Sequence, residues 1–181
     1  FEHTSQVRYA ATHFVTSSRS RRTWSQFLAP LFSHQVEGDF QVGPFHIRAT
    51  RRGLEKVRNE LSEVLRLMDL ANLYDKRIDH STWQAIRESM LKQPQTEVSP
   101  EASRRFLSLL AEPARLAGLL RRLHELRVLE CFIPAIRKAR WLLQFNEYHK
   151  YTVDEHSLRA VEIATDFSLA EGTLGEAYRS F

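Results

Sequence analysis

The sequence predicts an all-α, multi-helical fold that contains one small β-hairpin. Only 6 glycines and 6 prolines occur among 181 residues, so few positions interrupt helices. Apolar residues recur three and four positions apart along most of the chain, which indicates amphipathic helices. The period changes to two over residues 39–48 alone. No apolar run approaches the roughly 20 residues that span a membrane, and the shares of 43% hydrophobic and 27% charged residues are ordinary for a globular domain.

The elements begin with a helical pattern over residues 4–32. The hairpin follows over residues 39–48, where a Gly43-Pro44 turn separates two short runs of alternating polarity. The alternating apolar positions are Phe40, Val42, Phe45 and Ile47. Because an isolated hairpin is marginally stable in water, its apolar face is expected to lie against helices.

Two further helices are expected before a break in the chain. Thr50 is placed to cap a short helix, and an amphipathic helix follows it. Ser81 or Thr82 begins another helix, in which Trp83 is expected to be a core residue. The apolar stripe of the amphipathic helix comprises Leu61, Val64, Leu65, Met68 and Ala71.

Residues 93–100 are the best candidate for a linker, and they divide the chain into regions 1–93 and 99–181. Ser99 followed by Pro100 is typical of an N-cap with proline in the first helical position. A break near Pro113 then separates two leucine-rich helices, and Ile133-Pro134 begins another.

Charge and cysteine usage narrow the functional class. A single cysteine, Cys131, excludes an intrachain disulfide and suits a reducing cytoplasm; between Leu129 and Phe132 it is interpreted as a core residue. The net charge is +4, from 26 basic and 22 acidic residues, and arginine pairs occur at 21–22, 51–52, 104–105 and 121–122. Because acidic residues lie near most of these pairs, solvated helix faces explain them better than nucleic-acid binding does.

The stretch 151–157 combines a helix start with a histidine. Thr152 is expected to be an N-cap, with Glu155 completing a capping box. His156 shares one stripe of that helix with apolar residues, so it needs either a buried partner or a ligand such as a metal. The other members of the stripe are Val153, Ala160, Ile163 and Phe167. His46 and His124 are interpreted as satisfied surface or edge histidines.

Residues 151–157 read Tyr-Thr-Val-Asp-Glu-His-Ser and follow a Phe-Asn-Glu-Tyr-His stretch. This string resembles the opening of the HD domain in the bifunctional uridylyltransferase/uridylyl-removing enzymes that modify the signalling protein PII. Residues 123–134 resemble the approach to that domain in the family, although Arg127 and Ala135 replace its usual glycine and acid. The hairpin and the helix after it are similar to the region that follows the family's nucleotidyltransferase core.

The resemblance implies that this chain, which begins at Phe1, is the central fragment of such an enzyme. It implies that His156 is a metal ligand of the HD phosphodiesterase in the full-length enzyme, with His149 and Asp154 supporting that site. The metal would be Mg²⁺ or Mn²⁺. The fragment has neither a Gly-Ser loop with Asp-x-Asp nor a His-Asp doublet, so it is expected to lack both activities and to bind no metal tightly.

The implied partners of the parent enzyme are PII and UTP, in the cytoplasm and without a membrane. The apolar stripe from Val153 to Phe167 is expected to be covered by Leu169, Leu174 and Tyr178, or by a second copy in a homodimer.

Two other interpretations of the function stay open. One is a stand-alone, divergent HD phosphohydrolase, and the other is a basic helical module that binds nucleic acid or protein.

Overall fold

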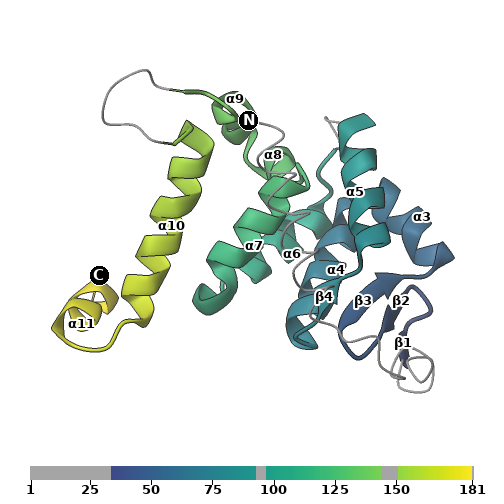
Figure 1. Cartoon of the computed structure of the whole chain (residues 1–181), viewed down its shortest axis with the longest axis horizontal. Helices are drawn as coiled ribbons and strands as arrows, with labels where there is room; N and C mark the ends of the chain where they lie inside the picture. Colours follow the sequence, from purple (N-terminus) through teal and green to yellow (C-terminus); the bar gives the residue numbers. More distant parts are fainter. Residues whose placement is uncertain (1–33, 93–96, 144–150, 181) are drawn as a thin grey trace, which may run out of the picture.

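The protein is described by a computed structural model, which covers residues 34–92, 97–143 and 151–180. Over these residues the chain is mostly helical with one small sheet, which confirms the predicted fold class (Figure 1). The predicted helical segment 4–32 lies outside the described residues.

The sheet has four short strands in the order β1-β2-β3-β4. The predicted hairpin is present as the antiparallel pair β2 and β3, in which Val42 is opposite Ile47. Strand β4 pairs in parallel with β3, so the sheet is larger than a hairpin. The sequence pattern missed β1 and β4 because three and two residues are too few to show a period of two. The strands are β1 (His34–Val36), β2 (Phe40–Val42), β3 (His46–Ala49) and β4 (Arg77–Ile78).

One face of the sheet is buried against helices. Phe40 and Ile47 are fully enclosed, whereas Arg48 donates to Gln41 Oε1 on the exposed face at 2.6 Å. The covering helices are α3 (Arg51–Asn59), α4 (Leu61–Leu73) and α5 (His80–Lys92). A Cβ atom at Gly53 would lie 1.9 Å from the Asp39 carbonyl oxygen, so only glycine lets α3 come this close to the sheet.

Two of the predicted helix starts are confirmed, and one is placed differently. Thr50 accepts a hydrogen bond from Gly53 N, and Ser99 accepts one from Ala102 N. Helix α5 begins earlier than predicted, because the carboxylate of Asp79 accepts from the Ser81 and Thr82 amides. Trp83 is 4% exposed and belongs to the core, as predicted.

The second half of the described chain adds helices to the same core. Helix α6 packs against α4, and the connected cluster of buried side chains includes Leu65, Phe106 and Leu119. This cluster extends across the predicted boundary between residues 93 and 99; residues 93–96 lie outside the described part. The helices are α6 (Pro100–Leu110), α7 (Pro113–Glu125), α8 (Leu129–Phe132) and α9 (Pro134–Ala139).

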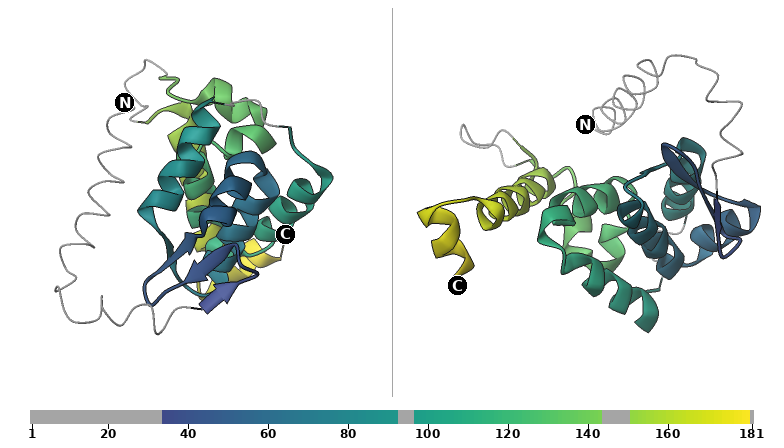
Figure 2. Two further views of the ribbon diagram at one scale, coloured as in Figure 1. Left: turned by 90° about the vertical axis from the view of Figure 1, so that its right-hand side faces the viewer. Right: turned by 90° about the horizontal axis from the view of Figure 1, so that it is seen from below.

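Helix α10 (Val153–Leu169) runs beside α7 at the end of the molecule opposite the sheet, and α11 (Thr173–Arg179) follows it (Figures 1 and 2). Residues 151–157, which carry the family resemblance, lie at this end. None of the helices in the described ranges is both long and apolar enough to cross a bilayer.

Candidate functional site on helix α10

Helix α10 has two faces with different surroundings. Asp154, Leu158 and Thr165 are buried on the side that packs against α7. On the other side, Ile163 is 55% and Phe167 39% exposed. The stripe predicted from the sequence therefore exists, but it is the outer face of the helix and not the face that joins the core.

His156 lies on this outer face. Together with neighbouring side chains it lines a shallow, mostly apolar groove of about 510 Å³. The Arg159 guanidinium covers one end, 4.0 Å from the centre of the Tyr151 ring. The other lining residues are Ala160, Ile163, Ala164 and Phe167. The side chains of Leu169, Leu174 and Tyr178, which were expected to cover this stripe, lie outside the described set.

The start of α10 differs from its prediction in one respect. Thr152 is the N-cap residue, but its side chain makes no capping hydrogen bond. The carboxylate of Glu155 accepts instead from Arg121 at 3.1 Å and from Arg159 at 3.0 Å. The predicted capping box is therefore wrong: the ion pair with α7 takes the carboxylate that would have closed it.

Asp154 points in the opposite direction from His156, into the interface with α7. Its Oδ2 lies 3.0 Å from Nε2 of His124, and the two side chains are 2% and 10% exposed. Burial lowers the pKa of His124, and Arg140 lowers it further, although Asp154 opposes both. The imidazole is therefore neutral near pH 7, and its Nε2–H donates to the carboxylate.

A buried ion pair between Arg140 and Glu130 holds the backbone of His124. Arg140 Nη2 donates to the His124 carbonyl oxygen at 2.7 Å, and its Nε donates to the carboxylate of Glu130. Glu130 is 3% exposed and Arg140 8%, so this ion pair is shielded from water. The position of His124 is thus fixed through its backbone as well as its ring.

The structure brings His124 and Asp154 together, a pair that the sequence did not predict. His124 was interpreted as a surface or edge histidine, yet it is buried and bonded to Asp154. Its place in the apolar row with Leu119, Leu120 and Leu123 was the available signal. By contrast, Asp154 and His156 are not brought together, and His149 lies outside the described residues.

The donor atoms around His156 do not form a metal centre by themselves. Asp154 is engaged by His124, and Glu155 and Glu162 by Arg121. Within residues 34–92, 97–143 and 151–180, no group of three or more histidine, cysteine, aspartate or glutamate side chains is arranged to hold a metal ion. The described residues therefore do not fit the full ligand set of an HD site.

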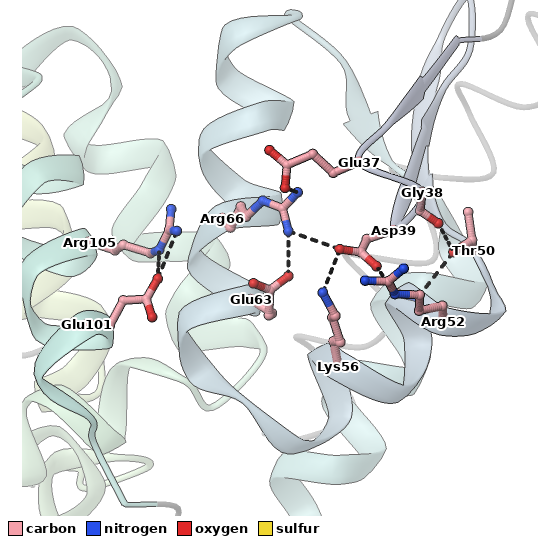
Figure 3. A network of polar contacts seen from close by, with 11 residues as sticks. Glu37, Gly38, Asp39, Thr50, Arg52, Lys56, Glu63, Arg66, Glu101 and Arg105 are labelled. Carbon is pink, nitrogen blue, oxygen red and sulfur yellow. Dashed lines mark hydrogen bonds and ion pairs between the residues drawn. The ribbon is translucent and has the colours of Figure 1, made fainter.

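A second charged cluster lies at the other end of the molecule (Figure 3). Asp39, 1% exposed, contacts Lys56 at 2.7 Å, Arg52 at 3.1 Å and Arg66 at 3.2 Å. Burial raises the pKa of Asp39, but hydrogen bonds from Lys56 and Arg66 outweigh it and hold that pKa below its ordinary value. This cluster ties the sheet to α3 and α4 and is structural.

No protein-family model matches the chain, and no solved structure matches it.

Proposed function

We propose that this chain is the central, structural part of a PII uridylyltransferase/uridylyl-removing enzyme, where it connects a UTP-dependent nucleotidyltransferase to an HD-type phosphodiesterase. In this proposal α10 is the first helix of the HD domain and presents His156 to its metal. The string at residues 151–157 suggested the family.

The observation that carries the proposal is the placement of His156. One face of α10 is fixed to α7 through Leu158 and Asp154, while His156 occupies the opposite, accessible face. An exposed imidazole beside an apolar groove can contact a partner surface. The groove itself could be covered by further apolar helices that pack into it. A metal ligand at the junction of two packed units would have these surroundings.

The other members of the site would come from the rest of the parent enzyme. A divalent ion, Mg²⁺ or Mn²⁺, would there activate water for hydrolysis of the uridylyl phosphodiester. PII and UTP are the partners that the proposal implies, and the cytoplasm is its setting. Asp154 would support His156 through the backbone of α10, because its own carboxylate faces α7.

The test uses the full-length enzyme with purified PII. His156→Ala should lower uridylyl removal by at least about 100-fold, since losing a ligand should cost no less than losing a residue that supports one. Uridylyl transfer should stay unchanged. His46→Ala is the matched control, because His46 is an exposed histidine in the hairpin. Unchanged removal in His156→Ala would refute the proposal.

A homodimer through the same groove is the alternative that the exposed face favours. Ile163 and Phe167 are both exposed there, and two copies of α10 would hide them from water. Light scattering of this chain over a range of concentrations tests it, with Ile163→Lys as the variant. A dimer that this substitution dissociates would support self-association, whereas a monomer at all concentrations would exclude it.

A further inference from the structure

We propose that His124 is a positioning residue: its hydrogen bond to Asp154 fixes the first turn of α10 on α7 and thereby determines where His156 points. The inference rests on the proposed function, because positioning matters only if His156 acts. It assigns a role to a histidine that the sequence pattern placed at the surface.

Helix geometry links the direction of Asp154 to that of His156. Asp154 and His156 are two residues apart, so their side chains leave the helix about 200° apart. A contact that fixes Asp154 against α7 therefore fixes the direction of His156 on the outer side. The bond is 3.0 Å long and lies at the buried start of α10, within one turn of the histidine.

Apart from the packing of Leu158 against α7, few polar contacts hold this turn among the described residues. Val153 N donates to the Leu142 carbonyl oxygen at 2.9 Å, which fixes the chain entering the helix but not its rotation. Thr152 makes no side-chain cap. The Arg121–Glu155 ion pair is 21% and 25% exposed, so water screens it more than it screens the buried pair.

His124 is suited to the task because its own position is rigid. It is near the end of α7, and its carbonyl oxygen accepts from Arg140, which is paired in turn with Glu130. The second oxygen of Asp154, Oδ1, is buried without a hydrogen-bond partner among the described residues. The bond from His124 is thus the one that holds this carboxylate, and removing it would leave a buried charge unsatisfied.

The first experiment follows amide hydrogen exchange in this chain. In His124→Leu, amides of residues 153–160 should exchange at least about tenfold faster than in the wild type, because the lost hydrogen bond also leaves the buried Asp154 carboxylate without its partner. Amides of α4 should change less. His124→Gln should restore slow exchange, because the glutamine amide can donate from nearly the same place as Nε2. His46→Gln is the control for the substitution itself.

Two results would overturn the positioning role. Exchange that rises equally in α4 and α10 would mean that the pair only adds global stability, and failure of His124→Gln to rescue would mean that the bond is not what matters. If His124→Leu does not fold, the ¹⁵N chemical shifts of the wild-type ring decide instead. The proposal requires a proton on Nε2 of His124, so a proton on Nδ1 alone contradicts it.

The second experiment separates this inference from the proposed function. In the full-length enzyme, His124→Leu should lower uridylyl removal about tenfold or more, as expected for a residue that supports a ligand, while transfer is retained and His124→Gln recovers removal. If His156→Ala abolishes removal but His124→Leu does not affect it, only the positioning role fails. If His156→Ala has no effect, the proposed function fails and the positioning role fails with it.

Discussion

Two buried aspartates lie at opposite ends of the described part of the molecule, and their surroundings differ. Asp39 at the sheet and Asp154 at α10 are each 1% exposed. Asp39 is contacted by three cationic side chains from α3 and α4. Among the described residues, the Asp154 carboxylate is hydrogen-bonded by the imidazole of His124, whose carbonyl oxygen accepts from Arg140. The Asp39 carboxylate is ion-paired with three cations, whereas the Asp154 carboxylate accepts one hydrogen bond from His124, on a helix whose outer face carries exposed apolar side chains.

This difference indicates that Asp39 stabilises the fold, whereas Asp154 orients a helix. The cations around Asp39 connect elements that are all packed into the core, so the cluster stabilises the fold itself. The His124–Asp154 pair lies beneath a helix whose opposite face carries His156 and an apolar groove. A contact at such a place controls the direction of an accessible side chain. Its loss should increase local opening of α10 more than global unfolding.

Removing the Asp39 carboxylate, which three cations contact, should have the largest effect. Asp39→Ala leaves Arg66 and Lys56 partly buried without their shared anion, which should reduce the free energy of unfolding by about 3–5 kcal/mol. Urea unfolding followed by circular dichroism measures it. The control is Glu101→Ala, whose exposed pair with Arg105 should contribute less than about 1 kcal/mol. Equal losses in the two variants would contradict the contrast (Figure 3).

The two faces of α10 should differ by a smaller amount. Leu158→Ala removes a side chain that is 5% exposed and should reduce the free energy of unfolding by about 2–4 kcal/mol. Ile163→Ala, on the outer face at 55% exposure, should change it by no more than about 0.5 kcal/mol. Thermal unfolding of the two variants checks this. A large loss for Ile163→Ala in a monomer would mean that the outer face packs within this chain.

The smallest expected effect is a pH dependence that comes from His124. The folded state lowers the pKa of this imidazole, so the unfolded chain takes up a proton first as the pH falls below about 6.5. Its contribution to stability is therefore complete above that pH and is lost as the pH falls toward the folded pKa. The groups that face the ring are Asp154, Arg140 and Glu130.

Urea midpoints at pH 7.5 and pH 5.5 measure this dependence. The wild type should lose more stability between the two values than His124→Gln, which cannot titrate. Asp39 does not contribute in that window, because a lowered carboxyl pKa matters only below about pH 4. A wild type and a His124→Gln variant with the same slope would show that the ring is not held neutral by the fold.

The local chemistry of the sequence determined most helices and the hairpin. Thr50 and Ser99 cap the helices they were expected to cap, since a hydroxyl that bonds an amide three residues later needs only local geometry. The alternation around Gly43-Pro44 determined β2 and β3 in the same way. His156 was singled out from its stripe of helix positions, which is also a local property.

Tertiary packing decided what local patterns left open. Helix α10 has apolar residues on two sides, and only contact with α7 made Leu158 interior and Ile163 exterior. Competition from Arg121 for Glu155 removed the predicted capping box, and the burial of His124 depended on Asp154, 30 residues away. Strand β4 needed β3 as a template, because two residues form a strand only where a neighbour supplies the hydrogen bonds. Each of these outcomes depends on a partner distant in the chain, which periodicity does not record.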